Sequence, residues 1–197
     1  RLGIGFYHWW NEALHGFARC GVATVFPQAI GLAAAWSPEL LQRVGDIAAT
    51  EGRAKNNEEL ASNNGNSRSA HGITIWSPNI NIVRDPRWGR GQETYGEDPF
   101  LTAMMGNAFV HGLQGDDPHY LKTVATLKHF AVHSGPEPLR HEFDARTSEK
   151  DLRDTYLPAF EDGIREGGAK SVMSAYNAYD GTPCAVSHRL LTEILRE

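Results

Sequence analysis

The stretch from residue 79 to residue 98 concentrates side chains that could do chemistry: three arginines, several acids, two aromatic rings and three glycines. Arginine and aspartate in one short segment indicate an ion-paired loop that is held rigid. Glycines let the backbone come close to a ligand. Arg84 and Arg87 lie beside Asp85, and we expect them to brace the loop. Arg90 lies deepest, between two glycines, and we predict that it faces a ligand.

A second candidate pair, Lys128 and His129, comes near the end of the apolar run 124–131. Lysine is rarely buried without a partner, so a polar pocket at the end of a strand is the natural place for it. The alternative is that the strand has simply ended and both side chains face water. We favour the pocket.

Aromatic residues crowd the first 26 positions, and Glu12 lies directly after two tryptophans and an asparagine. Sugars present C–H faces to rings and hydroxyl groups to carboxylates, so this mixture suits a small polar ligand. We expect Trp9 to belong to the core and His15 to support the loop.

Apolar periodicity and capping signals predict alternating strands and helices along the chain. A serine cap followed by Pro38 begins one helix, Pro158 interrupts another, and Met104 and Met105 are expected to face inward. Residues 61–70 are rich in turn formers and predict a surface loop. The expected strands are 30–36, 72–76, 124–131 and 171–176, and the expected helices are 38–56, 99–113, 149–166 and 190–195.

This alternation indicates a parallel sheet with crossover helices, in about four units. A doubly wound sheet and part of a (β/α)-barrel both fit the alternation. The chain has no Gly-x-Gly-x-x-Gly after its first strand and no phosphate loop, which weakens the nucleotide-binding sheet. In a barrel the site lies at the carboxyl ends of the strands. The candidates lie there in sequence: Arg90, Lys128, His129, Tyr176 and Asn177.

Length and composition fit one domain with a real core. The chain has 197 residues, of which 41% are hydrophobic and 22% charged, and its net charge is −5. That charge argues against nucleic acid or an anionic membrane as the main partner. No apolar run is long enough to span a bilayer, and no signal peptide is visible at the start. We expect Cys20 and Cys184 to be two buried thiols.

The motif from Arg84 to Pro99, Arg-Asp-Pro-Arg-Trp-Gly-Arg-Gly-Gln-Glu-Thr-Tyr-Gly-Glu-Asp-Pro, resembles the signature loop of glycoside hydrolase family 3. With Trp9-Trp-Asn-Glu-Ala-Leu-His-Gly16 upstream, it most resembles the β-xylosidase branch of that family of β-glucosidases and β-xylosidases. The resemblance implies a TIM-barrel-like α/β fold in which residues 1–197 are one incomplete domain, about the first half to two thirds of the barrel. The rest of the barrel and a second α/β-sandwich domain would be absent.

The resemblance also implies an activity: hydrolysis of terminal, non-reducing β-D-xylosyl or β-D-glucosyl residues with retention, without metal or cofactor. It places no catalytic carboxylate in this chain, because the nucleophilic aspartate is expected beyond Glu197. Glu12 matches an acid that holds sugar hydroxyls, Arg90, Lys128 and His129 match sugar-binding residues, and Tyr176 matches a tyrosine beside the nucleophile. The weaker assignments are Trp76 as an aromatic wall, Arg140 as a further sugar contact and Met173 as pocket wall.

Two other functions stay open at this point. A non-catalytic sugar-binding protein becomes the more favoured alternative if the 197 residues are the whole molecule. A metal-dependent hydrolase is suggested by nine histidines, among them His133 and His141, but no His-x-His or His-Glu-x-x-His spacing occurs. The expected partner is a monosaccharide or small oligosaccharide. An unpaired sheet edge also predicts self-association or a second chain, and for the parent enzyme we favour a periplasmic or extracellular location.

Overall fold

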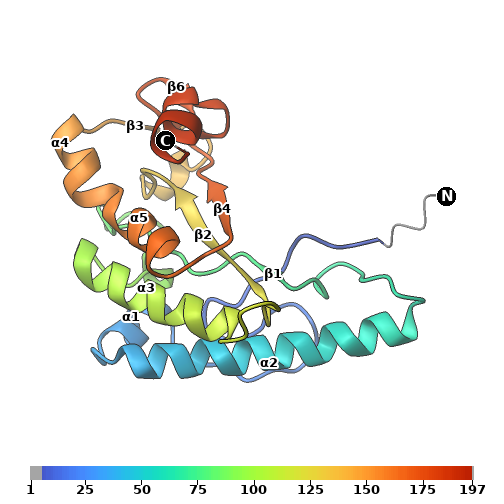
Figure 1. Ribbon diagram of the computed structural model, residues 1–197. Coiled ribbons are helices and arrows are strands. Elements are labelled where there is room, and N and C mark those ends of the chain that lie inside the picture. Colours follow the sequence, from blue (N-terminus) through green and yellow to red (C-terminus); the bar gives the residue numbers. More distant parts are fainter. Residues whose placement is uncertain (1–5, 197) are drawn as a thin grey trace.

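The centre of the protein is a parallel sheet. The computed structural model describes residues 6–196, in which the strands lie in the order β1 (Thr74–Ile75), β2 (Val124–Phe130) and β4 (Ser171–Ser174) (Figure 1). Asn11 forms a parallel bridge to Ile75, so the chain before Glu12 takes a fourth parallel position beside β1. This order follows the sequence, as in the barrel-like α/β fold that the resemblance implies.

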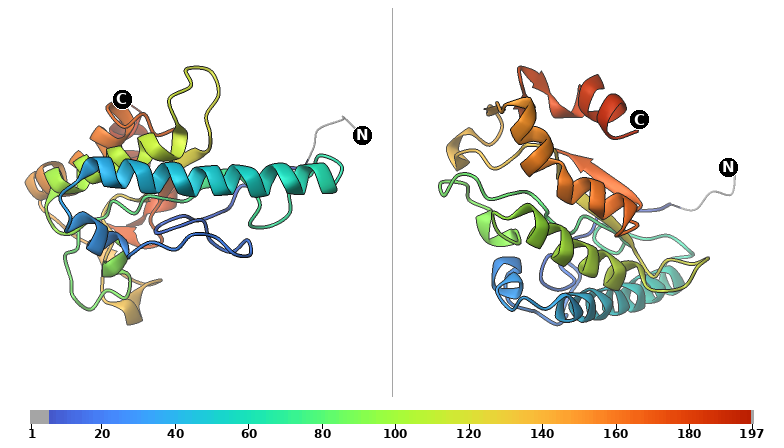
Figure 2. Two further views of the ribbon diagram at one scale, coloured as in Figure 1. Left: turned by 90° about the horizontal axis from the view of Figure 1, so that it is seen from below. Right: turned by 60° about the vertical axis from the view of Figure 1, so that its left-hand side comes forward.

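Helices cover one side of the sheet. Helix α2 (Pro38–Ser62) packs on α3 (Pro99–Gln114), and α3 packs on α5 (Pro158–Arg165), so the three form a row (Figure 2). The row keeps the sequence order of the strands. The shorter helices are α1 (Ala29–Ala33), α4 (Glu149–Asp151), the π-helical turns Leu152–Tyr156 and Arg189–Ile194, and the 3₁₀ turns Gly91–Glu93, Glu137–Leu139 and Cys184–Val186. A second small sheet joins β3 (Asp144–Ala145), β5 (Ala178–Tyr179) and β6 (Thr182–Pro183).

The capping signals begin the helices where the sequence predicts. The Ser37 side chain accepts the Leu40 amide at 3.2 Å, and Pro38 occupies the first helical position. Asp98 caps α3 in the same way. Pro158 ends the π-helical turn and starts α5, so the predicted interruption of the 149–166 helix is confirmed.

Two predicted elements differ in the structure. The run 30–36 was expected to be a strand, but it contains most of helix α1. Its alanines favour a helix, and a short apolar run cannot be assigned by periodicity alone. Helix α2 continues to Ser62 instead of ending near Asn56. Asn56 is buried and donates a hydrogen bond to the His71 carbonyl at 2.7 Å, so a tertiary contact overrides its low helix propensity.

Two apolar side chains predicted to be inside lie at the surface. Trp9 is 69% exposed and Met104 is 42% exposed, whereas Met105 is buried as predicted. Trp9 lies on the face of the sheet that the helix row leaves open. Cys20 and Cys184 are both free and buried, as predicted. Among the residues described, none of the helices has the length and apolar character needed to cross a membrane.

Helices α2 and α3 touch through glycines, which gives a first prediction. A Cβ on Gly112 would overlap the Gln42 carbonyl oxygen and lie 2.8 Å from the Asp46 amide nitrogen. We therefore expect Gly112→Ala to lower the free energy of unfolding by about 1–3 kcal/mol, measured by urea denaturation. Gly31→Ala is the control, because its Cβ would meet nothing closer than 3.8 Å. It should be neutral or stabilising by up to about 1 kcal/mol. Equal effects of the two changes would contradict this packing.

Candidate functional site

Glu12 and Lys128 form the first part of the candidate site. Glu12 directly follows Asn11, and its amide donates to the Asn11 side-chain oxygen at 2.7 Å. Its Oε1 lies 3.6 Å from Lys128 Nζ, and its Oε2 lies 3.4 Å from Arg19 Nε. Lys128 is only 1% exposed near the end of β2. Burial lowers the pKa of Lys128 to about 8, although the Glu12 carboxylate acts in the opposite direction.

Arg90 forms the second part and is held from two sides. Its Nε and Nη2 donate to Glu93 Oε2 at 2.9 and 2.5 Å, and its Nη1 lies 3.1 Å from His129 Nε2. Glu93 lies in the 3₁₀ turn that begins one residue after Arg90, so the loop itself supplies the counter-charge. The arginine is thus fixed in direction with its charge balanced.

The other two arginines of the loop brace it, as predicted. Arg87 donates to both oxygens of Asp85, at 3.0 and 2.7 Å, and remains mostly exposed. The Arg84 guanidinium lies over the ring of Phe143 at 5.8 Å and over that of Tyr156 at 5.7 Å. These contacts hold the loop and its neighbouring segments together. Arg90 is then the one of the three loop arginines that reaches β2.

Two buried histidines lie beside Arg90. The rings of His129 and His133 are 4.8 Å apart. Burial lowers the pKa of His133 to about 4, and the pKa of His129 lies well below its ordinary value because of burial and because of the charge of neighbouring residues. Both imidazoles are therefore neutral near pH 7.

Tyr176 and Arg140 complete the polar cluster. Tyr176 follows β4, is 47% exposed, and its ring lies 5.6 Å from that of His129 and 6.0 Å from that of His141. Arg140 forms an ion pair with Glu137, and its positive charge also disfavours protonation of His129. Glu137 accepts the Gly89 amide at 3.0 Å, so this segment is bound to the Arg90 loop.

Trp76 and Met173 lie outside the polar cluster and line a hollow of their own. The Trp76 indole donates to the Trp9 carbonyl at 2.8 Å, and Met173 pairs in register with Lys128. This hollow has a volume of about 410 Å³ and lies on the open face of the sheet. It is lined by Trp9, Thr74, Trp76, Thr126, Ser171, Val172, Met173 and Ser174.

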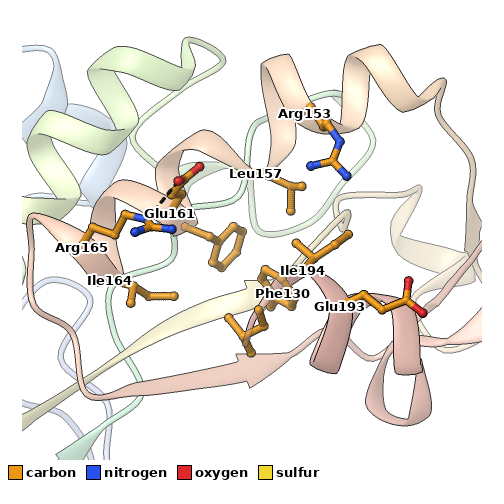
Figure 3. Close-up of a pocket in the computed structure, with 10 residues that line it drawn as sticks. Phe130, Arg153, Leu157, Glu161, Ile164, Arg165, Glu193 and Ile194 are labelled. Atoms are coloured by element: carbon orange, nitrogen blue, oxygen red, sulfur yellow. Dashed lines mark ion pairs between the residues drawn. The ribbon is translucent and has the colours of Figure 1, made fainter. Parts of the chain in front are cut away.

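A second hollow, of about 380 Å³, lies between α5 and the C-terminal π-helical turn (Figure 3). Apolar side chains face one another across it, and charged residues such as Arg153, Glu161 and Glu193 stand at its edge. It lacks the converging donors and acceptors of the polar cluster. We therefore assign the candidate site to the cluster at the strand ends.

Sequence reasoning missed two residues that hold the cluster in place, Glu93 against Arg90 and Asn81 against His129. Asn177, which was a candidate because it follows a strand, holds His133. Asn81 had a signal, because polar side chains at positions 79 and 81 alternate with two isoleucines. Such alternation indicates an extended segment with one polar face. In residues 6–196, no three histidine, cysteine or acidic side chains are grouped so that they could hold a metal ion.

The fold defines a class: a barrel-like α/β domain, here with a candidate site at the carboxyl ends of its strands. Residues 7–197 match the model of the glycosyl hydrolase family 3 N-terminal domain. The chain therefore belongs to glycoside hydrolase family 3.

Curated relatives and solved structures agree with this family assignment. A xylan 1,4-β-xylosidase of Xylanibacter ruminicola is 50% identical over 100% of this chain and 23% of its own length. The exo-1,4-β-xylosidase bxlB of Emericella nidulans is 44% identical over 100% of this chain and 26% of its own length. The chain thus spans about a quarter of these relatives.

Among solved structures, the family 3 exo-β-xylosidase XlnD in complex with a xylobiose aziridine probe superposes with a TM-score of 0.85 and 38% identity, over 96% of this chain and 25% of that one. A β-glucosidase from Listeria innocua gives a TM-score of 0.77 and 32% identity, over 94% and 23%. The parallel fold is thus shared with both xylosidases and glucosidases.

Proposed function

We propose that this chain is the sugar-binding part of a retaining family 3 β-glycosidase that removes terminal β-D-xylosyl or β-D-glucosyl residues from non-reducing ends. The observation that carries the proposal is the meeting of Glu12, Lys128, Arg90 and His129 in one cluster at the strand ends. A monosaccharide offers several hydroxyl groups, each both donor and acceptor. The cluster offers charged donors from Lys128 and Arg90 and an acceptor from Glu12, which suits such a ligand.

The acids of the cluster are engaged in a way that suits binding more than attack. Glu12 lies near Lys128 and Arg19, and Glu93 is bound by Arg90. Retaining glycosidases need two carboxyl groups that flank the scissile bond, one as nucleophile and one as acid and base. We therefore assign Glu12 and Glu93 to orientation and assign the reacting carboxylates to other parts of the enzyme. In this proposal the chain is an incomplete barrel.

Xylose is the preferred sugar in this proposal, because the two curated relatives compared above carry the name xylosidase. Tyr176 and Arg140 would border the sugar on the side of β4 and the 137–140 turn. Trp76 and Met173 would form a wall toward the open face of the sheet. No cofactor is needed for the reaction, since carboxylates and water supply its proton transfers.

The experiment is a calorimetric titration of the full chain with methyl β-D-xyloside, together with an assay on an aryl β-xyloside. We expect binding without turnover. Glu12→Gln should weaken binding about 10- to 100-fold, because it removes a charged acceptor and the counter-charge of Lys128. Glu97→Gln, at an exposed acid near the same loop, is the control and should bind like the wild type.

Two results would contradict the proposal. Turnover of the aryl xyloside by the chain alone would show that the reacting carboxylates lie in these residues. Equal affinity in wild type, Glu12→Gln and Glu97→Gln would show that the sugar, if bound, lies elsewhere.

A further inference from the structure

Asn81 is a buried asparagine whose side chain makes four contacts with the end of β2. Its Oδ1 lies 2.9 Å from both the His129 backbone nitrogen and His129 Nδ1. Its Nδ2 donates to the carbonyl oxygens of His129, at 2.9 Å, and Ala131, at 3.2 Å. Both hydrogen-bonding groups of the side chain are thus directed at one short segment, residues 129–131.

These contacts fix the direction of each hydrogen bond. Carbonyl oxygens only accept, so the amide nitrogen of Asn81 must face the two carbonyls and its oxygen must face the imidazole. An amide oxygen also only accepts, so His129 Nδ1 must carry a hydrogen. The neutral ring then has its lone pair on Nε2.

The far side of the ring requires the same tautomer. The atom 3.1 Å from His129 Nε2 is Nη1 of Arg90, and a guanidinium can only donate. A hydrogen on Nε2 would place two donors against each other. Asn81 on one side and Arg90 on the other therefore both need the Nδ1–H form.

We propose that Asn81 is a positioning residue of this site: it fixes His129 as the Nδ1–H tautomer, and His129 Nε2 in turn accepts from Arg90 and sets the direction of its guanidinium. Glu93 holds the opposite edge of the same guanidinium. The inference rests on the proposed function, because Arg90 is one of the residues assigned there to the sugar.

The neighbouring histidine repeats the arrangement independently. Asn177 Nδ2 donates to the carbonyls of Val132, at 2.9 Å, and Ala178, at 2.7 Å, so its Oδ1 faces His133 Nδ1 at 2.7 Å. His133 is thereby held in the same tautomer. Within the described residues its buried Nε2 has no hydrogen-bond partner, so no arginine is attached to this second pair. The pair at Asn177 therefore offers a matched comparison for Asn81.

Replacing Asn81 by aspartate should change the protonation of His129. A carboxylate facing Nδ1 stabilises the imidazolium, whose second hydrogen would sit on Nε2 and oppose Arg90. The charged and titratable groups around His129 are Lys128, Arg90, His133, Arg140, Glu12, Glu93 and Tyr176. The cations among them oppose protonation of His129. The added carboxylate must therefore stabilise the imidazolium by more than these cations destabilise it.

The test is nitrogen-15 NMR of the histidine side chains in the full chain, with His129 and His133 assigned from the resonances that are lost in His129→Asn and His133→Asn, respectively. The wild type should show a protonated Nδ1 and a bare Nε2 at His129 at pH 7. Asn81→Asp should show imidazolium at His129 and bind methyl β-D-xyloside about tenfold more weakly. Asn177→Asp, the control, should alter the resonances of His133 and leave the tautomer of His129 unchanged.

A wild-type His129 that carries its hydrogen on Nε2 would overturn the inference, and this measurement needs no variant to fold. A folded Asn81→Asp with the wild-type tautomer and affinity would overturn it as well. The tautomer is measured without sugar, so a failure of the proposed function can be told apart from a failure of this inference. If the wild type shows the expected tautomers but does not bind the xyloside, only the sugar site is contradicted.

Discussion

Lys128→Met is expected to weaken binding of methyl β-D-xyloside by about 100-fold while making the chain more stable. The side chain is buried at the end of β2, and its ammonium group is the donor opposite Glu12. Charged hydrogen bonds contribute about 1.5–3 kcal/mol, which corresponds to roughly 10- to 100-fold in affinity. Loss of the cation also leaves Glu12 with Arg19 alone, so we place the effect at the upper end.

The gain in stability follows from the lowered pKa of Lys128. Its pKa in the folded state is about 8, against an ordinary value of 10.5. The unfolded state therefore binds the proton more tightly, and below pH 8 this disfavours folding by about 3 kcal/mol, at about 1.4 kcal/mol for each pH unit. Methionine has a similar length and carries no charge. We thus expect a gain of up to about 3 kcal/mol at pH 7, measured by urea denaturation.

The same pKa predicts how binding depends on pH. Affinity of the wild type should fall as the pH rises through about 8, since Lys128 loses its proton. Lys150→Met is the matched control, because Lys150 on α4 is exposed and pairs with Asp154 in the following π-helical turn. It should leave both affinity and its pH dependence unchanged. A Lys128→Met chain that binds xyloside as tightly as the wild type would remove Lys128 from the site.

The starts of the main helices could be predicted from sequence because their signals are local. A capping side chain and a proline mark the first turns of α2 and α3, and Ser148 accepts the Asp151 amide at 3.0 Å as the near capping box predicts. The predicted strand 30–36 failed for a local reason, because a short apolar run is ambiguous by periodicity alone. The other failures depended on the fold around the residue. Helix α2 passes Asn56 because that side chain finds a carbonyl 15 residues away, and Trp9 is exposed because no helix lies on its face of the sheet.

The candidate site also contains residues that could be predicted from sequence and residues that could not. Lys128 and Arg90 could be selected because a buried lysine and an arginine between glycines are unusual in themselves. Glu93 could not, since an acid in a loop looks the same in sequence whether or not it binds an arginine. The alternation around Asn81 indicates an extended segment with a polar face, but it does not indicate which residue that face meets. Their roles come from the fold, which brings Asn81 beside a histidine 48 positions away. The residues that touch a ligand are thus easier to predict than those that orient them.

Acidification from pH 6.5 to 4 is expected to lower the free energy of unfolding by at least about 3 kcal/mol. The pKa of His133 is about 4 in the folded state, against an ordinary value of 6.5, because burial disfavours its charged form. Between these values the unfolded state takes up a proton that the folded state does not, so stability is lost as the pH falls. His129, whose pKa is also lowered, acts in the same direction.

His133→Asn should remove about 3 kcal/mol of this pH dependence, measured as the difference between urea denaturation at pH 6.5 and at pH 4. An asparagine amide can still donate to Asn177 Oδ1, which now receives its hydrogen bond from His133 Nδ1 at 2.7 Å, but it cannot titrate. His119→Asn, at an exposed side chain, should keep the slope of the wild type. If His133→Asn and His119→Asn lose stability equally on acidification, the acid sensitivity lies in other groups and His133 is not buried in its neutral form.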